Sequence, residues 1–371
     1  MLYIGADISK DKVSVAFARK GQILLSKEFA ISTEDLNLIR LTIKQTGERK
    51  LTVFLEQTGI YSFPVIWFFW ELRGEGYKVS IRLVDGLRFH RYIKLYGEKK
   101  TDKKDAVSLV KYGMEGLPTR ELTESDIRVY WLKWLITERE KLLKERTMIQ
   151  NFLRQKIEVL YPDMKQYNKT QFWSKVLNYD FAKEKSITGI LYAGLLKRDI
   201  ERIRLINKQL EEVEEDIRDF IETYHREDTE ILRSFGFSHI TCAYLISVYI
   251  NVERFPDVKK FKSYMGLGLR VHQSGKKEKN VINTYTNKLV RKLIYMYVIQ
   301  AIRERSNHKR VKEYFLRIKE REQSTKKAVY KTASKVIEWV YYCLKHKEKF
   351  NQNKEDSHET QQANAGKDNS Q

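Results

Sequence analysis

Four acidic residues in the first third of the chain have the type and spacing to hold divalent cations. Asp7 lies near the end of an apolar segment, Glu56 directly follows another, and Asp102 and Asp105 are three residues apart. Four carboxylates gathered at one place would repel one another without cations, and hard ions such as Mg²⁺ or Mn²⁺ prefer oxygen ligands. Paired ions of this kind stabilise both oxygens of a phosphoryl transfer. The quartet therefore predicts metal-dependent phosphodiester chemistry.

Each of these acidic residues also has an ordinary structural role when it is considered alone. Asp7 fits a turn at a strand end, Glu56 fits a helix cap, and Asp102 with Asp105 fits the acidic first turn that a helix dipole favours. Nearby positive charge favours the metal site, because it would draw a phosphate backbone toward the carboxylates. The basic residues near the aspartate pair are Arg88, Arg91, Lys94, Lys99, Lys100, Lys103 and Lys104. For the outermost lysines, a solvated run of charge is the alternative.

The first 84 residues alternate between strand and helix patterns. Short apolar runs with high β propensity predict strands, and apolar residues at helical spacing predict the helices between them. The expected strands are 2–8, 13–17, 23–29, 51–55 and 79–84. The first expected helix begins after an N-cap at Thr33, and the second covers 61–75. The order βββαβαβ is that of the RNase H-like (RuvC-like) nuclease fold, whereas periodicity by itself supports only an α/β domain with a mixed sheet.

This strand order would gather the carboxylates. The first and fourth strands of an RNase H-like sheet are neighbours, so Asp7 and Glu56 would lie together although they are 49 positions apart. A helix that begins near Thr101 would present Asp102 and Asp105 on one face, because residues at i and i+3 share a helix face. That helix face would close the same site.

Beyond Pro118 the chain is expected to be mainly helical. A helix over 129–160 is followed by one whose apolar residues recur at alternating steps of three and four, the seam of a coiled coil. The seam residues are Ile203, Ile206, Leu210, Val213, Ile217, Phe220 and Tyr224. An antiparallel hairpin and dimerisation through these helices both explain the seam, and either forms a spacer.

The region from 229 to 347 is helical, basic and rich in aromatic residues, with interruptions at a glycine-containing loop, 266–268, and at a polar stretch, 273–280. The residues after Phe350 are polar and have nothing to bury, which predicts disorder. The expected divisions are an RNase H-like domain at 1–117, a coiled-coil region at 118–228, a mostly helical C-terminal domain at 229–349 and a disordered tail at 350–371.

The overall charge indicates a polyanionic partner. The 371 residues include 70 Lys and Arg against 49 Asp and Glu, a net charge of +21, and nucleic acid is the first candidate for such a surplus. A membrane surface is the alternative, but no segment approaches the ~20 apolar residues of a membrane-spanning helix. Cys242 and Cys343 indicate neither a disulfide scaffold nor a zinc site. We expect a cytoplasmic, nucleoid-associated protein.

Three segments resemble the acidic blocks of a known transposase family. Residues 5–10 (GADISK), 54–59 (FLEQTG) and 100–106 (KTDKKDA) look like the three blocks of the DEDD insertion-sequence transposases related to the Piv invertase, the IS110 family. The resemblance implies that all four acidic residues hold catalytic Mg²⁺ or Mn²⁺. It also implies several partners: DNA at the element ends and at the target, a structured guide RNA, and further copies of the chain in a dimer or tetramer.

The C-terminal region carries a second resemblance to the same family. Residues 254–256 (RFP), 264–267 (YMGL) and 273–277 (QSGKK) are similar to its C-terminal transposase domain. The serine before the glycine is there the nucleophile that joins covalently to DNA, which implies this role for Ser274. Neighbouring cations would stabilise the charge that develops at phosphorus. These cations are Arg270, Lys276, Lys277 and Lys279. An exposed loop without chemistry is the alternative.

One segment departs from the family pattern. Residues 234–243 occupy the position of a helix-hairpin-helix-like element that grips DNA backbone through glycine amides. This chain reads FGFS at 235–238, without the usual proline and second glycine. The resemblance therefore does not extend to backbone gripping by Gly236, and Ser234, Ser238 and His239 are the other candidates for phosphate contact.

Three functions compete at this point. The first is a recombinase in which Ser274 forms a 5′-phosphoserine link and the acidic residues, from the same or another protomer, hold metal. The second is a metal-dependent endonuclease that resolves DNA junctions, with water as the nucleophile. The third is a nucleic-acid-binding protein without catalysis. We expect the first, because the acidic quartet and the serine both match one family.

Overall fold

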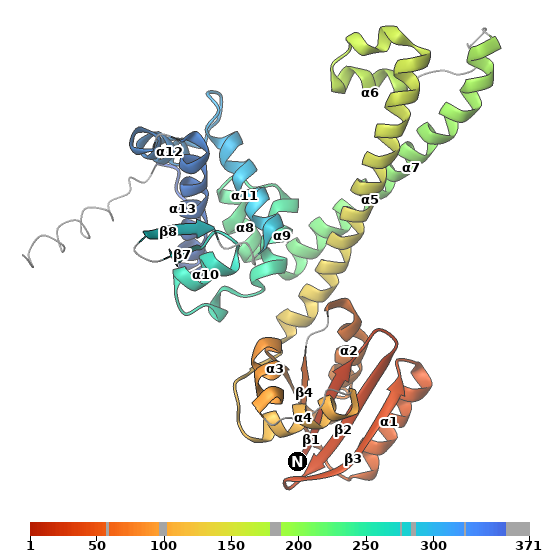
Figure 1. Ribbon diagram of the computed structural model, residues 1–371, viewed down its shortest axis with the longest axis vertical. Coiled ribbons are helices and arrows are strands. Elements are labelled where there is room, and N and C mark those ends of the chain that lie inside the picture. Colours follow the sequence, from red (N-terminus) through yellow and green to blue (C-terminus); the bar gives the residue numbers. More distant parts are fainter. Residues whose placement is uncertain are drawn as a thin grey trace, which may run out of the picture. The chain divides into compact units, whose positions relative to one another are not determined.

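The computed structural model describes residues 1–56, 59–95, 102–178, 187–274, 277–282, 287–322 and 324–353. The chain forms two compact units, 1–130 and 131–371. Figure 1 shows a strand-rich first unit and a helical second unit. The division follows Tyr130 and not Pro118, because Leu122, Ile127 and Tyr130 pack into the core of the first unit.

The first unit is built on a mixed six-stranded sheet in the order β3-β2-β1-β4-β5-β6. Its strands are β1 (Leu2–Ile8), β2 (Lys12–Arg19), β3 (Gln22–Ala30), β4 (Lys50–Glu56), β5 (Lys78–Val84) and β6 (Thr119–Glu121). β1 pairs antiparallel with β2 and parallel with β4, and β4 pairs parallel with β5. This is the predicted RNase H-like fold. The short β6, antiparallel to β5, is an addition to the predicted strands.

Helices lie against both faces of this sheet. α1 (Thr33–Gln45) and α2 (Phe63–Glu71) share one core with alternate residues of β1, such as Ile4. α3 (Gly86–Leu95) and α4 (Asp102–Met114) share a second core with Phe54 of β4. Because side chains alternate along a strand, these two cores lie on opposite faces of the sheet. The labels in Figure 1 locate each helix.

Two helix ends differ from the prediction. Ser32 and not Thr33 caps α1, because its hydroxyl accepts a hydrogen bond from the Asp35 amide. The second helix is divided into a 3₁₀ turn, Gly59–Ser62, and α2, which ends at Glu71. A turn follows directly, and it includes Gly76 with a φ of 83°, a conformation that favours glycine.

An antiparallel helix pair begins the second unit. α5 (Glu124–Leu160) and α7 (Ile187–Tyr224) are cross-linked by Arg139 to Glu214, Arg146 to Asn207 and Lys156 to Asp199. In these three pairs the residue numbers rise along α5 while those of their partners on α7 fall, so the two helices run in opposite directions. The seam residues Ile203, Ile206 and Leu210 are buried with residues of α5. Of the two predicted explanations for the seam, the structure therefore has the hairpin. A 3₁₀ turn, Pro162–Gln166, and α6 (Lys169–Leu177) lie between the two helices in the chain.

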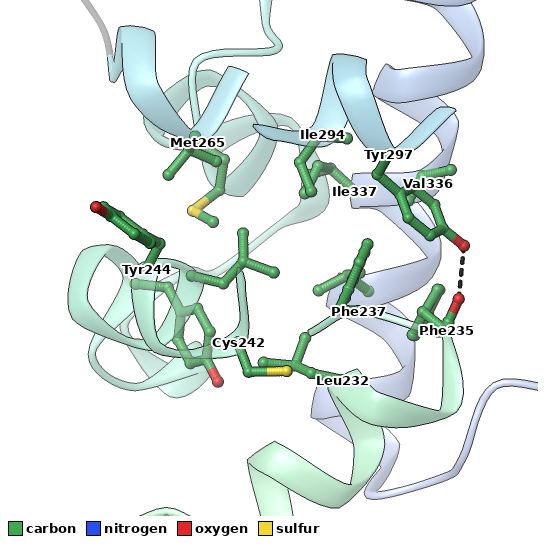
Figure 2. Packing of buried hydrophobic residues seen from close by; sticks show 14 of the residues in the cluster. Leu232, Phe235, Phe237, Cys242, Tyr244, Met265, Ile294, Tyr297, Val336 and Ile337 are labelled. Carbon is green, nitrogen blue, oxygen red and sulfur yellow. Dashed lines mark hydrogen bonds between the residues drawn. The ribbon is translucent and has the colours of Figure 1, made fainter. Parts of the chain in front are cut away.

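The remaining helices enclose the largest core of the second unit. They are α8 (Arg226–Ser234), α9 (His239–Tyr249), α10 (Val258–Tyr264), α11 (Lys288–Ala301), α12 (Lys309–Arg321) and α13 (Thr325–His346), with a 3₁₀ turn at Val252–Arg254. Figure 2 shows part of this core, where the Tyr297 hydroxyl donates a 2.7 Å hydrogen bond to the Phe235 carbonyl. No helix in the described part of the chain is long and apolar enough to cross a membrane.

Two expectations for the C-terminal region need correction. The described residues of the polar stretch, 273–274 and 277–280, belong to two paired antiparallel strands, β7 (Leu269–Ser274) and β8 (Lys277–Ile282). Phe350, the first residue of the expected tail, is 6% exposed and stacks on Phe235 with ring centroids 4.1 Å apart. An aromatic residue has enough apolar surface to pack even at the edge of a polar segment. Residues 354–371 of the expected tail lie outside the described residues.

Candidate active site

Asp7 and Glu56 lie at the ends of two neighbouring parallel strands. The register of β1 and β4 runs from Leu2 beside Leu51 to Ala6 beside Leu55. One residue further along each strand are Asp7 and Glu56. Parallel strands end at the same edge of a sheet, so the two carboxylates occupy one edge, as the strand order predicts.

Both acidic residues also point to the same face of the sheet. Tyr3 of β1 and Phe54 of β4 stack with ring centroids 6.3 Å apart, so these two side chains lie on one face of the sheet. Asp7 and Glu56 follow at intervals of two, and side chains at that spacing share a face. A Cβ atom added at Gly5, on the same face, would lie 2.1 Å from the Ala106 carbonyl oxygen of α4. The face that carries both carboxylates is therefore the one on which α4 packs.

α4 brings a third acidic residue to this face. Asp105 directly precedes Ala106, the residue whose backbone contacts Gly5, and its side chain is only 6% exposed. Burial of a carboxylate is costly without partners. Asp102 begins α4, and its side chain lies outside the described residues. The structure thus places Asp7 and Glu56 at one edge of this face and buries Asp105 in the helix that packs on the face.

The carboxylate oxygens of these residues have the donor chemistry that Mg²⁺ or Mn²⁺ requires. No group of three or more His, Cys, Asp or Glu side chains among the described residues is arranged to hold a metal ion. A fourth ligand, Asp102, is predicted at the start of α4.

Two glycines that the sequence analysis does not single out shape this site. Gly5 lets α4 approach the sheet, as described above. A Cβ atom added at Gly86 would lie 2.4 Å from an Oε1 atom of Glu56, so the first residue of α3 contacts that carboxylate. Nothing in the local sequence indicates either role, because the contacts join segments that are far apart in the chain.

The predicted basic residues fall into two groups. Arg88 and Arg91 are exposed on α3, and the Arg88 amide donates a 2.9 Å hydrogen bond to the Asp85 carboxylate at the start of that helix. Lys99 and Lys100 lie outside the described residues. Lys103 and Lys104 belong to α4, but their side chains also lie outside the described part of the chain. Arg88, Arg91 and Lys94, which is also exposed, therefore lie on the helix whose first residue contacts Glu56.

The serine site lies on the β7–β8 hairpin of the second unit. Ser274 is the last residue of β7 and pairs with Lys277, the first residue of β8. Arg270 belongs to β7 and Lys279 to β8. The side chains of all these residues lie outside the described part, as do Gly275 and Lys276 altogether. The backbone thus positions Ser274 where the first strand of a hairpin ends.

Polar groups in and beside the turn at 235–238 form hydrogen bonds within the chain. Gly236 has a φ of 87°, its amide donates to the Arg233 carbonyl, and a Cβ atom added there would lie 2.4 Å from His308 Nε2. Ser234 likewise accepts a hydrogen bond from the Phe350 amide. These contacts leave neither the Gly236 amide nor the Ser234 hydroxyl directed at a ligand.

The other two candidates for phosphate contact in this segment have partners as well. The Ser238 hydroxyl caps α9 by accepting a hydrogen bond from the Thr241 amide. His239 Nε2 lies 3.3 Å from a Glu222 carboxylate oxygen. Burial lowers the pKa of His239, which favours its neutral form. A neutral imidazole beside a carboxylate is a weak anchor for phosphate.

Comparison with known proteins points to one class of enzyme. A transposase family model of the DEDD IS110 type matches residues 4–162, and the model of the transposase IS116/IS110/IS902 family matches residues 228–316. Similar solved structures include RuvC of Thermus thermophilus in complex with a Holliday junction substrate, with 13% identity, a TM-score of 0.25, and coverage of 33% of this chain and 99% of that chain. Another structure of Thermus thermophilus RuvC has 13% identity, a TM-score of 0.23, and coverage of 33% and 100%. No curated protein matches the chain in sequence.

Proposed function

Because the chain belongs to the IS116/IS110/IS902 family of transposases, we propose that it cleaves and rejoins DNA with Ser274 as nucleophile and a metal site at Asp7, Glu56, Asp102 and Asp105. The observation that supports the acidic half is the register of β1 and β4, which ends at Ala6 beside Leu55, one residue before Asp7 and Glu56, on the sheet face that α4 covers at Gly5. Carboxylates at adjacent strand ends are costly to keep together without cations.

The proposed reaction begins at the Ser274 hydroxyl. Its oxygen attacks the phosphorus of a DNA strand and loses its proton, a serine–phosphate bond forms, and the bond from phosphorus to the 3′-oxygen breaks. The products are a 5′-phosphoserine link and a free 3′-hydroxyl. Attack of a 3′-hydroxyl on the link then restores the phosphodiester and releases Ser274. Arg270, Lys276, Lys277 and Lys279 would stabilise charge on the phosphoryl oxygens.

The acidic residues hold and orient the strand in this proposal. Mg²⁺ or Mn²⁺ bound by Asp7, Glu56, Asp102 and Asp105 would supply positive charge to the phosphate oxygens. Arg88 and Arg91, exposed on α3, bind neighbouring phosphates, together with Lys99, Lys100, Lys103 and Lys104. These contacts fix the position of the DNA without selecting its sequence.

Covalent trapping tests the proposal. The full chain is incubated with DNA that carries the element ends, with Mg²⁺, and the products are denatured and separated by size. We expect a protein–DNA adduct that disappears in Ser274→Ala and in Asp7→Asn. The matched control is Asp11→Asn, an exposed aspartate in the turn after β1, which retains the adduct.

The second candidate is a hydrolytic endonuclease that acts on DNA junctions. The two neighbouring strand-end carboxylates favour it, because they alone can support metal-dependent attack by water. Metal-dependent cleavage that persists in Ser274→Ala, without any adduct, would select this function and reject the serine mechanism. If Asp7→Asn and Glu56→Gln both still cleave DNA, the recombinase and the endonuclease functions are both rejected.

We extend the proposal to partners that family membership suggests. These are DNA at the element ends and target, a structured guide RNA, and further copies of the chain in a dimer or tetramer. Sedimentation of the purified chain measures the oligomeric state, and sequencing of co-purified RNA identifies a guide. Full activity after ribonuclease treatment of the isolated protein would contradict a role for RNA.

A further inference from the structure

α3 presents two contrasting faces. Its Phe89 and Tyr92 rings are buried against Tyr112 of α4, with ring centroids 6.0 and 5.2 Å from that residue. On the opposite side, Leu87 is 74% exposed and Leu95 is 84% exposed. The buried aromatic residues therefore hold the helix in place, while its two leucines contribute little to the core.

Only one of these exposed leucines lies at the acidic site. Leu87 directly follows Gly86, the residue that contacts the Glu56 carboxylate, whereas Leu95 is the last residue of the helix. Two turns of helix, about 12 Å at 1.5 Å per residue, separate the two leucines. A single exposed leucine needs no explanation in itself, but Leu87 combines exposure with a position one residue from a contact to a predicted metal ligand.

The residues around Leu87 suit a nucleic-acid strand. Arg88 follows it, and Arg91 lies one turn further along the same exposed side of α3. Arginines bind phosphate groups, and apolar side chains inserted beside a base can separate it from its neighbours in the stack. A strand whose phosphate reaches Glu56 would pass this pair of arginines and bring a base to Leu87.

We propose that Leu87 contacts a DNA base next to the phosphate that is cleaved and holds this base out of its stack, while Arg88 and Arg91 bind the flanking phosphates. This inference rests on the proposed function, because it assumes DNA at the acidic site. The occupant is DNA because a transposase acts on DNA ends, and the positive charge of the arginines complements its backbone. Leu87 is thus a substrate-positioning residue.

Fluorescence of 2-aminopurine tests the contact, since this base brightens when it leaves the stack. The full chain is mixed with element-end DNA in which 2-aminopurine replaces successive bases, in the presence of Mg²⁺ and with Ser274→Ala in every variant so that the DNA stays intact. We expect one position to brighten with the chain that is otherwise wild type. The increase is lost in Leu87→Ser, kept in Leu87→Met, which restores an apolar side chain, and kept in the matched control Leu95→Ser.

Cleavage and folding provide the second readout. We expect DNA cleavage by Leu87→Ser to fall about ten-fold, the effect of losing one contact to a base, while its thermal unfolding matches that of Leu95→Ser. Equal 2-aminopurine signals in Leu87→Ser and the wild type would overturn the inference. A signal that depends on Leu87 with RNA of the same sequence but not with DNA would also overturn it. Failure of the proposed function gives a different result: the wild type then shows no DNA cleavage that depends on Asp7.

Discussion

At the scale of single residues, the position of the Glu56 carboxylate depends on the absence of a side chain at Gly86. A Cβ atom there would lie 2.4 Å from Oε1 of Glu56. We expect Gly86→Ala to displace this carboxylate and to lower metal-dependent cleavage by about ten-fold or more, since small misplacements of a catalytic group are costly. The free energy of unfolding should change little, because the end of a glutamate side chain moves easily.

Parallel assays of DNA cleavage and thermal unfolding measure these two effects. Gly194→Ala is the matched control, because nothing lies within 4 Å of a Cβ atom added at that helical position. Full cleavage activity in Gly86→Ala would show that Glu56 tolerates the added methyl group and would contradict the prediction.

A second prediction at this scale concerns the partly buried carboxylate of Asp228. Burial raises the pKa of Asp228, and the 2.6 Å hydrogen bond from the Tyr249 hydroxyl opposes this rise only in part. The folded state therefore binds the proton of this carboxyl group more tightly than the unfolded state does. The stability that this group contributes is complete below its unfolded pKa and is lost as the pH rises through the raised folded pKa.

Asp228→Asn removes that titration. We expect the variant to gain stability relative to the wild type as the pH rises from acidic to neutral. Urea unfolding at several pH values, followed by circular dichroism, measures the difference. Asp219→Asn, at an exposed position on α7, should show no such trend. A difference for Asp228→Asn that is independent of pH would refute this assignment.

At the scale of secondary-structure elements, the contact between α4 and the sheet requires glycine at position 5. An added Cβ atom would lie 2.1 Å from a backbone oxygen of α4 and 2.7 Å from a methyl group of Val110. Backbone atoms cannot move aside without shifting the helix, so Gly5→Ala should destabilise the first unit by about 1–3 kcal/mol. Because α4 carries Asp105, cleavage should fall as well. Wild-type thermal unfolding of Gly5→Ala would contradict this prediction.

The antiparallel pair of α5 and α7 offers a matched test on adjacent residues. Leu153 is fully buried in their shared core, whereas the neighbouring Phe152 is 57% exposed. Leu153→Ala should cost about 2–5 kcal/mol, and Phe152→Ala should cost much less. Similar losses for the two variants would contradict the observed helix faces.

At the scale of the whole molecule, the net charge of +21 governs the approach to DNA. Each phosphate that a basic residue neutralises releases counterions, so affinity falls steeply as salt rises. If six or more phosphates are contacted, we expect a loss of about a thousand-fold or more between ~50 and ~200 mM salt. Fluorescence anisotropy with a labelled duplex measures this dependence.

Single substitutions locate the cations that contribute to it. Arg91→Ala should reduce the slope of log affinity against log salt by about one, whereas Lys44→Ala, on α1 and exposed, should leave the slope unchanged. Equal slopes in these two variants and the wild type would mean that Arg91 does not bind phosphate.

The order of elements in the first unit could be predicted from the sequence because it depends on local patterns. Each of the five predicted strands is a short apolar run, and the helices between them repeat at helical spacing. This order is that of the RNase H-like fold, in which β1 and β4 are neighbours, and it therefore predicts that Asp7 lies close to Glu56. The three-residue β6 was beyond such patterns, because a segment that short has no periodicity of its own.

Other features were decided only when distant segments met. A coiled-coil seam indicates that α7 packs on another helix. Only the structure identifies that helix as α5 of the same chain. The strands of the β7–β8 hairpin are six residues each and mostly polar, so the composition of this stretch did not indicate their backbone pairing. Gly5, Gly86 and Phe350 likewise acquire their roles from neighbours remote in the sequence. Local propensity specifies elements, whereas the close contacts that shape the site exist only after the elements have packed.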